Sequence, residues 1–341
     1  MVTLICPVRG CGAPLSRADR ALVCPRGHRF DRARSGYHNL LQPQQRRSRR
    51  PGDSAAALAA RRRLFDRGLG DWLVPHLLAA FDALRLPPGA AVLDVGCGEG
   101  FYLGTLARER PIEAHGLDIS APAVDLAARR YPHVTWIVAN ADRTLPYAAG
   151  SFDLALALTS RLNPAELRRV LAPAAAMPPA PAAPTLPPAD AAPAARESGG
   201  FLLLAVPAAD DLVELRATVL GEGRLRDRLQ PALATLAADF ALVRHVTVRT
   251  RLRLDAGAAR DLLAATYRGA RHRERQRAAG LSQPATPTET TEPTEPIGPI
   301  GTAAPTEPAA IEVTASRDLA DLRALPAAVA GDRGQPPRWP L

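Results

Sequence analysis

Residues 91–102 read AVLDVGCGEGFY, an apolar run that gives way to alternating glycines. Asp94 stands near the end of the run, and Gly96, Gly98 and Gly100 follow at every second position. Glycines there let the backbone turn sharply and approach a ligand that a Cβ atom would keep away. Helical spacing begins at residue 101. The stretch therefore predicts a strand, a tight ligand-binding loop and a helix.

Apolar runs of strand length recur on both sides of this loop. They occupy 91–95, 114–119, 134–139, 153–158 and 201–206, and segments with helical spacing, such as 101–109 and 121–131, separate most of them. Buried parallel strands are continuously apolar because helices cover both faces of the sheet. The pattern predicts an α/β fold with a doubly wound, Rossmann-like sheet. The alternating stretch 242–254 predicts an outer strand, and 310–315 predicts the last strand.

The polar residues that follow the next strands indicate which ligand the loop binds. The glycine pattern is D-x-G-x-G-x-G, whereas dinucleotide-binding proteins typically have G-x-G-x-x-G. Asp118 ends the second strand, 18 residues after Gly100, where a carboxylate can accept both hydroxyls of a ribose. Asn140 and Asp142 follow the third strand, where an amide or carboxylate can bind an adenine amino group. The arrangement favours S-adenosylmethionine; a nicotinamide cofactor and an empty, degenerate site are the alternatives.

The predicted cofactor-binding residues lie in and after these strands. They are Asp94, Gly96, Cys97, Gly98, Glu99, Gly100, Tyr102, Leu103, Asp118, Ile119, Asn140, Ala141 and Asp142. For three of them another role is open. Asp94 can hold the loop through backbone N–H groups, Cys97 suits packing better than nucleophilic attack, and Tyr102 suits either the core or the cofactor's methionyl end.

Three of the four cysteines lie close together near the N-terminus. Cys6, Cys11, Cys24 and His28 form the pattern C-x4-C-x12-C-x3-H, with turn-forming glycines and prolines around both pairs. Two short ligand pairs on separate turns can hold a tetrahedral Zn²⁺ ion. Because the protein supplies all four ligands, such an ion is structural and does no chemistry. Free thiols beside a surface histidine are the alternative.

The chain is basic, with a formal net charge of +9, and all 43 of its basic residues are arginine. The position of these arginines is therefore more informative than their identity. Those between residues 46 and 67 predict a surface that contacts phosphates, with a solvated basic helix face as the alternative. No apolar run approaches the roughly 18 residues that cross a bilayer, and no secretion signal is evident. We therefore expect a cytoplasmic protein.

Two low-complexity segments divide the second half of the chain. Residues 172–199 are rich in alanine and proline, and residues 281–309 in proline, threonine and glutamate, so both are predicted to be disordered loops. The expected organisation is a zinc module at 1–45, a basic connecting segment at 46–75, a cofactor-binding domain at 76–280 interrupted by 172–199, the loop 281–309, and a last strand and tail at 310–341.

Several longer stretches together resemble one family. They are CPRGHRFDRARSGYHNLL at 24–41, RRSRRPGDS at 46–54, AARRRLFDRG at 59–68, VLDVGCGEGFY at 92–102, GLDIS at 116–120, AELRRVLAP at 165–173 and DLVELR at 211–216. The chain resembles the 23S rRNA (guanine-N1)-methyltransferases, bacterial enzymes that methylate a guanine in the hairpin 35 region. The resemblance implies a zinc module that recognises 23S rRNA, a class I methyltransferase domain that binds S-adenosylmethionine, and a homodimer.

The sequence departs from the family pattern around the side of the site that receives the base. The first cysteine pair is two residues further apart than the family's usual C-x2-C. In the family an aromatic residue before the sheet contacts the cofactor, and in this sequence Trp72 is the candidate to take its place. Asp211 stands where the family can place a histidine near the cofactor, so it joins the predicted cofactor-binding residues. Arg161, after the fourth strand, is a weak catalytic candidate, since an arginine there more often binds phosphate or carboxylate.

Two other functions remain open at this stage. A small-molecule methyltransferase could retain the zinc module as a scaffold. A non-catalytic rRNA-binding or assembly protein could keep the fold without transferring methyl groups. RNA-independent activity would indicate the first, and RNA binding without transfer would indicate the second.

Overall fold

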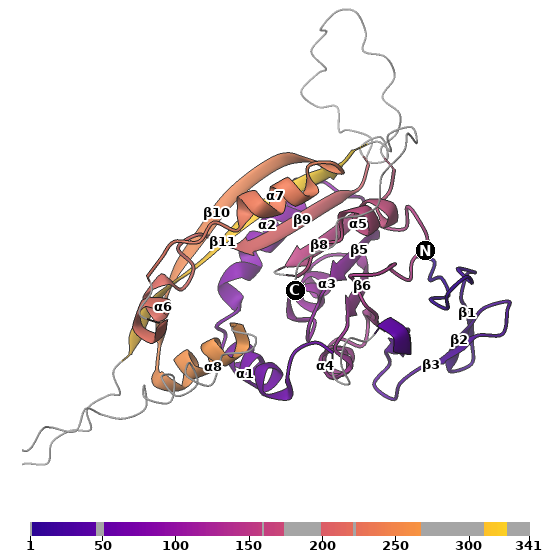
Figure 1. Cartoon of the computed structure of the whole chain (residues 1–341), viewed down its shortest axis with the longest axis horizontal. Coiled ribbons are helices and arrows are strands. Elements are labelled where there is room, and N and C mark those ends of the chain that lie inside the picture. Colours follow the sequence, from indigo (N-terminus) through magenta and orange to yellow (C-terminus); the bar gives the residue numbers. More distant parts are fainter. Residues whose placement is uncertain are drawn as a thin grey trace, which may run out of the picture.

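The computed structural model describes residues 2–45, 51–158, 160–173, 199–220, 223–266 and 310–325. Within these residues, an eight-stranded sheet forms the main domain and a three-stranded sheet forms the N-terminal module (Figure 1). The small sheet has the order β1 (Ser16–Ala18), β2 (Ala21–Val23), β3 (Arg29–Asp31). The large sheet has the order β10 (Phe240–Leu254), β11 (Ile311–Ala324), β9 (Phe201–Pro207), β8 (Leu154–Leu158), β5 (Ala90–Val95), β6 (Ile112–Asp118), β7 (Thr135–Val138), β4 (His38–Asn39).

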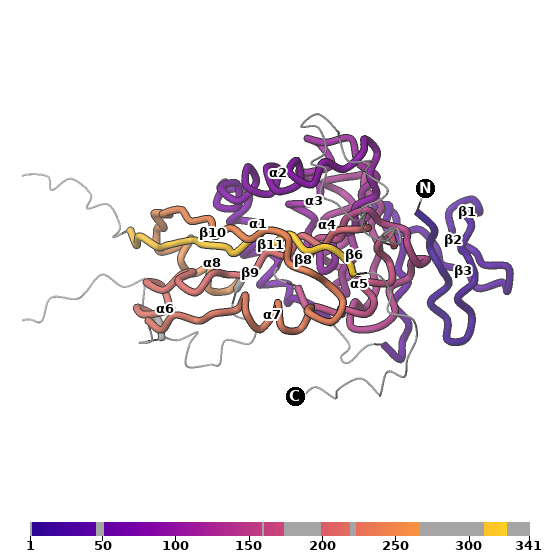
Figure 2. The backbone as a smooth tube through the Cα atoms, turned by 90° about the horizontal axis from the view of Figure 1, so that it is seen from above, coloured from indigo at the N-terminus to yellow at the C-terminus, as the bar shows by residue number. Residues whose placement is uncertain are grey.

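Helices cover both faces of the large sheet, as the continuous apolar runs predicted. The side chains of β5 alternate between two cores, with Leu93 in one and Val92 in the other. One core is closed by α2 (Val74–Ala83), α3 (Phe101–Glu109) and α4 (Ala121–Arg130), the other by α5 (Pro164–Val170) and α7 (Leu229–Leu236). Figure 2 shows these two groups on opposite sides of the sheet. The α/β prediction is confirmed.

The sheet is mixed rather than purely parallel. β4, β7, β6, β5, β8 and β9 run parallel, whereas β11 pairs antiparallel with both β9 and β10. The stretch 242–254 does lie in the outer strand β10, as predicted. The last strand is longer than the predicted 310–315 because it continues to Ala324 between two neighbours.

A third apolar core lies beyond the sheet, where the long pair β10 and β11 extends (Figure 1). It joins α1 (Ala55–Asp66), α6 (Val213–Leu220) and α8 (Ala256–Thr266) through Leu64, Leu215, Ala258, Ala259 and Leu263. α1 begins at Ser54, whose hydroxyl accepts a hydrogen bond from the Ala57 N–H. Residues 55–66 are therefore an integral helix of the domain, whereas the sequence suggested a connecting segment.

The N-terminal module is joined to the main domain by backbone hydrogen bonds. Ile5 N–H donates to the Pro146 carbonyl at 3.0 Å, and Ala148 N–H donates to Thr3 at 2.9 Å. β4, expected to belong to the separate module, instead forms the edge strand of the large sheet against β7. The N-terminal segment and the main domain are thus connected by backbone hydrogen bonds at this edge of the large sheet.

The predicted disordered loops lie largely outside the described residues, namely at 174–198 and 267–309. The described ends of the first segment lie together, because Gly200 N–H donates to the Ala172 carbonyl at 2.9 Å. The chain therefore leaves the sheet and returns to it at one place. No α-helix among the described residues combines the length and apolar character that a bilayer crossing requires.

Candidate functional site: a metal cluster and a cofactor cavity

The four predicted metal ligands come together in the N-terminal module. One ligand atom from each of Cys6, Cys11, Cys24 and His28 lies within 4.8 Å of the others. The Cys11 and Cys24 sulfurs are 3.8 Å apart, and the Cys24 sulfur lies 3.3 Å from Nδ1 of His28. Tetrahedral zinc with Zn–S bonds of about 2.3 Å and Zn–N bonds of about 2.0 Å needs ligand separations of this size. The donor set and spacing fit Zn²⁺ and leave no coordination position open.

The glycine loop after β5 has the sharp backbone that the sequence predicted. Gly96, Gly98 and Gly100 have φ values of +79°, +57° and +75°. The loop is held against β6, since the N–H groups of Gly96 and Cys97 donate to the Leu117 carbonyl at 2.7 and 3.1 Å. A left-handed backbone is accessible to glycine at little cost, so the loop can approach a ligand.

Two residues predicted to bind the cofactor, Gly100 and Leu103, are buried and are not among the residues that line the cavity. A Cβ atom on Gly100 would lie 2.3 Å from the ring of Trp136, so this glycine lets α3 lie close to the neighbouring strand. Leu103 is fully buried in the core beneath α2 and is not among the residues that line the cavity. The physical reason is that residue 103 lies on the core-facing side of α3, whereas Phe101 and Tyr102 reach the cavity.

A cavity of about 840 Å³ opens over the glycine loop and continues towards the ends of β8, β9 and β11. The predicted residues that line it are Asp94, Gly96, Cys97, Gly98, Glu99, Tyr102, Asp118, Ile119, Asn140, Ala141, Asp142, Arg161 and Asp211. Ligand pockets usually measure about 300–1,000 Å³. The volume can accept a nucleoside cofactor and leaves room for a second group beside it.

Three side-chain oxygens in this cavity are buried and have no hydrogen-bond partner. They are Oδ1 of Asp94, Oε1 of Glu99 and Oγ of Ser160. Burial, followed by the nearby charge of Asp118, raises the pKa of Asp94 to about 8. Buried polar groups are normally hydrogen-bonded, so unpartnered acceptors at a cavity wall suit a ligand that carries donors and positive charge. S-adenosylmethionine is such a ligand, and the cavity fits it.

The carboxylate of Asp118 is placed by the backbone around it. Its Oδ2 accepts from Gly98 N–H at 3.0 Å and its Oδ1 accepts from Ser120 N–H at 2.8 Å. These two bonds fix the carboxylate at the wall of the cavity, which Asp118 lines together with the glycine loop. The backbone thus fixes the orientation of the Asp118 carboxylate.

The amide of Asn140 is used within the protein. Its Nδ2 donates to the Gln45 carbonyl at 3.0 Å and its Oδ1 accepts from Asp142 N–H at 2.9 Å. Asn140 therefore shapes the loop, and the neighbouring Asp142 lines the cavity. Arg161, 71% exposed in its side chain, lies 3.5 Å from the Asp142 carboxylate. Arg161 therefore lies at the rim of the cavity as the partner of a carboxylate, and not deep inside it.

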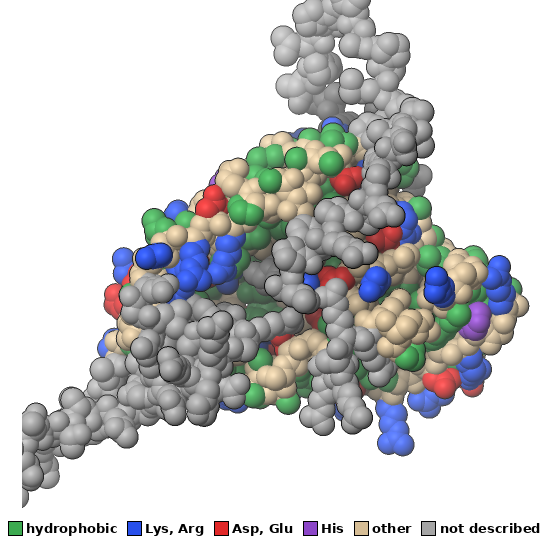
Figure 3. Space-filling model, viewed as in Figure 1, with side chains coloured by type: hydrophobic (Ala, Val, Ile, Leu, Met, Phe, Trp, Pro, Cys, Tyr) green, Lys and Arg blue, Asp and Glu red, His purple; other side chains and the backbone are tan. Residues whose placement is uncertain are grey.

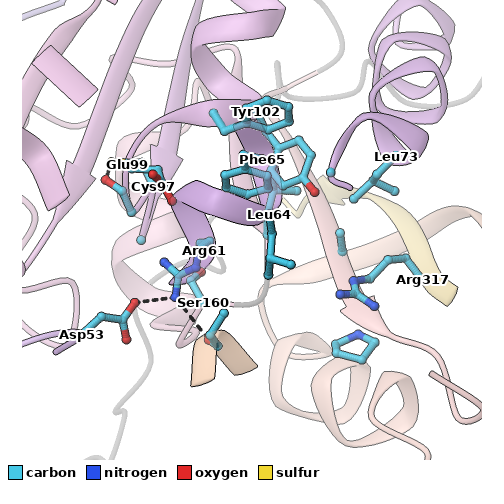
Figure 4. A pocket seen from close by; sticks show the side chains of 18 of the residues that line it. Asp53, Arg61, Leu64, Phe65, Leu73, Cys97, Glu99, Tyr102, Ser160 and Arg317 are labelled. Atoms are coloured by element: carbon cyan, nitrogen blue, oxygen red, sulfur yellow. Dashed lines mark hydrogen bonds and ion pairs between the residues drawn. The ribbon is translucent and has the colours of Figure 1, made fainter. Parts of the chain in front are cut away.

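Helix α1 forms a wall of the cavity that the sequence did not predict. Figure 4 shows Arg61, Leu64 and Phe65 reaching the cavity from this helix, opposite Cys97 and Glu99. Arg61 pairs with Asp53 at 2.7 Å, and a Cβ atom on Gly98 would lie 3.3 Å from its guanidinium. Phe65 stacks on Phe101 with ring centroids 4.2 Å apart.

Arg63 of α1 and Arg67, which follows the helix as its C-cap, contact a segment about 190 residues later in the chain. Arg63 donates to Asp261 at 2.8 Å and Arg67 to Asp255 at 2.6 Å, both on or next to α8. The prediction that these two arginines form a phosphate-contacting surface is therefore replaced by an ion-paired helix contact. Residues 46–50 lie outside the described part of the chain. The sequence alone could not predict these ion pairs, because Asp255 and Asp261 follow the arginines by about 190 residues.

Asp211 lines the cavity but is already paired. Its Oδ1 accepts from Arg317 at 2.7 Å and from Ser316 N–H at 2.9 Å. Trp72, the candidate aromatic, also lines the cavity. Arg317 was not predicted, because its position depends on β11 lying between β9 and β10.

Comparisons with known proteins agree with this architecture. A zinc-ribbon family described as "RlmA, N-terminal" matches residues 4–49, and a family described as "Methyltransferase domain" matches residues 92–177. A 23S rRNA (guanine(748)-N(1))-methyltransferase of Streptomyces fradiae is 37% identical over 257 residues, which cover 74% of this chain and 80% of that protein. A Micromonospora griseorubida protein, provisionally named a 23S rRNA (guanine-N1)-methyltransferase, is 34% identical over 71% of this chain and 76% of its own length.

Among solved structures, an S-adenosylmethionine-dependent methyltransferase from Thiobacillus denitrificans aligns with a TM-score of 0.38 and 18% identity, over 74% of this chain and 92% of that one. The fold, the cavity and the cysteine cluster define a class I, S-adenosylmethionine-dependent methyltransferase with an N-terminal zinc ribbon. Its sequence relatives narrow this class further. The chain belongs to the 23S rRNA (guanine-N1)-methyltransferase family.

Proposed function

We propose that this protein transfers a methyl group from S-adenosylmethionine to N1 of a guanine in the hairpin 35 region of 23S rRNA. The observation that carries the proposal is the single cavity that runs from the glycine loop to the ends of β8, β9 and β11, in a chain 37% identical to a 23S rRNA guanine-N1 enzyme. The volume of the cavity, about 840 Å³, supports a cofactor and an extruded base bound side by side. A base must leave its helix or loop stack before such a cavity can hold it.

The cofactor would supply an electrophilic methyl group on a sulfonium. Asp118 would bind the ribose hydroxyls, Asp142 the adenine amino group, and Arg61 the methionyl carboxylate beside Gly98. Transfer would form the bond between N1 and the methyl carbon and break the carbon–sulfur bond, whose electron pair stays on sulfur. The N1 proton would leave to water. The protein's main contribution is to align the two reactants.

The direct test is methylation of 23S rRNA transcripts by the purified protein. We expect one N1-methylguanosine, located by mass spectrometry in the hairpin 35 region. Methylation of small molecules without RNA would favour the scaffold alternative, and RNA binding without transfer of labelled methyl would favour a non-catalytic assembly protein. Either result would overturn the proposal.

Binding of S-adenosylmethionine should depend on pH through Asp94. Its pKa of about 8 is above the ordinary 3.8, so without cofactor the side chain is mostly neutral at pH 7. A cation in the cavity favours the charged form, so affinity should rise by up to about tenfold for each unit as pH increases towards 8. Calorimetry at pH 6.5, 7.5 and 8.5 measures this.

Asp94→Asn is the matched control for that measurement. It removes the titrating proton and keeps the shape, while any titration of the cofactor itself is common to both proteins. The difference between wild type and variant should vanish at low pH and widen as pH rises. Parallel pH profiles for the two proteins would refute this role of Asp94.

We also propose the cellular setting and the assembly that fit an rRNA substrate. A protein that methylates 23S rRNA would act in the cytoplasm, where ribosomes assemble. The family resemblance further supports a homodimer, and light scattering of the full chain would measure its mass directly.

A further inference from the structure

Arg216 is a buried arginine in the wall of the cofactor cavity. It lies on α6, lines the cavity, and is only 4% exposed. Its Nε has no hydrogen-bond partner, and its NH2 group makes one long contact, 3.4 Å, with the Ala209 carbonyl. Taking a guanidinium out of water is costly unless acceptors replace the water.

The carboxylates nearest in the chain are paired with other groups. Asp210 accepts from Arg249 at 2.7 Å, Asp211 accepts from Arg317 at 2.7 Å, and Glu214 accepts from Thr314 at 2.6 Å. Within the described residues, no ion pair involves Arg216. The described protein therefore leaves a positive, hydrogen-bond-donating group facing the cavity, and the occupant of the cavity can supply the acceptor.

The surroundings of Arg216 favour a nucleobase over a phosphate as its binding partner. Besides Arg216 and the ion pair of Asp211 and Arg317, the residues that line the cavity from β8, β9, the start of α6, β10 and α8 include the apolar side chains Leu158, Val206, Leu212, Leu252, Leu254 and Leu262. Of the other arginines that line the cavity, Arg161 is 71% exposed and Arg228, at the start of α7, is also exposed. Arg61 and Arg317 are part-buried, and each is ion-paired with an aspartate, which Arg216 is not. Figure 3 shows basic side chains gathered beside a hollow, between the places of α6 and α7 in Figure 1. Phosphates suit this wet rim, whereas a flat base suits the apolar interior.

We propose that Arg216 binds the O6 and N7 edge of the target guanine. An arginine that donates to O6 and N7 is the most common specific contact with guanine. It leaves N1 free to face the methyl group, and its charge stabilises the negative charge that develops on O6 as N1 loses its proton. Adenine presents an amino donor in place of O6, so a donor-only guanidinium rejects it. The inference rests on the proposed rRNA guanine-N1 activity.

The test is steady-state methylation of a 23S rRNA fragment by wild type, Arg216→Gln and Arg216→Lys. We expect Arg216→Gln to lose about 100-fold in kcat, and Arg216→Lys to recover part of it. Loss of the nearby positive charge should also raise the pH at which the rate levels off, by about one unit or more. Unchanged binding of S-adenosylmethionine, measured by calorimetry, shows that the variants remain folded.

Two controls separate base recognition from general effects. Arg228→Gln removes an exposed arginine of the same cavity and should alter mainly KM, in a salt-dependent manner. A fragment with 7-deazaguanosine at the target lacks the N7 acceptor, so wild type should lose about tenfold in kcat/KM and Arg216→Gln nothing further. Because the 7-deazaguanosine fragment is tested with the wild-type protein, this experiment does not depend on whether a variant folds.

The inference is overturned if Arg216→Gln binds S-adenosylmethionine and keeps the wild-type kcat and pH profile, or if 7-deazaguanosine is methylated as well as guanosine. Failure of the proposed function looks different, because wild type would then methylate no guanine in 23S rRNA at all.

Discussion

Replacing Cys24 with serine is expected to reduce the zinc content of the purified protein at least tenfold and to unfold the N-terminal module. Structural zinc contributes an apparent ~10–16 kcal/mol in small metal-binding modules. The module's own sheet adds little to this, since β1, β2 and β3 have three residues each and only Ala21 and Leu22 among them are buried. Elemental analysis gives the metal content, and amide hydrogen exchange reports the unfolding.

Cys97→Ser is the matched control, because Cys97 lies in the glycine loop and not in the metal cluster. It should retain the metal. The residues that line the cofactor cavity begin at Pro51, so Cys24→Ser should still bind S-adenosylmethionine while it loses methylation of rRNA. A Cys24→Ser protein with the wild-type zinc content would show that this cysteine is not a ligand.

Replacing Gly100 with alanine should lower the free energy of unfolding by about 2–5 kcal/mol. The φ of +75° costs an alanine about 1–2 kcal/mol, and the overpacking of its Cβ atom against Trp136 adds about 1–3 kcal/mol. The ring of Trp136 is buried in the core and cannot move aside easily. Urea denaturation followed by circular dichroism measures the loss.

Gly89→Ala isolates the steric contribution to this loss. Gly89 has nearly the same φ, +78°, but a Cβ atom there would meet nothing within 4 Å. It should therefore cost only the backbone contribution of about 1–2 kcal/mol. Equal losses for the two variants would mean that contact with Trp136 contributes nothing to the requirement for glycine at position 100.

Local patterns were sufficient for the strands, the glycine loop and the metal ligands. The run at 91–95 and the glycines after it specify a strand and a tight turn through neighbouring residues alone. Cys6, Cys11, Cys24 and His28 form two short pairs, so their spacing already restricts how they can meet. In each case the physical cause acts over a few residues, and the structure brings these ligands together as expected.

Contacts between distant segments account for what the sequence left open. The wall formed by Arg61 and Phe65 depends on α1 packing against α8 in the third apolar core. Asp255 and Asp261, about 190 residues further on, add ion pairs with Arg67 and Arg63 to this contact. Likewise, β11 places Arg317 beside the cavity because it is inserted between β9 and β10, although its polar stretch 316–318 does not look like a central strand. Local sequence specifies the backbone of the glycine loop and the spacing of the metal ligands. Burial and pairing between distant segments decide which side chains line the cavity.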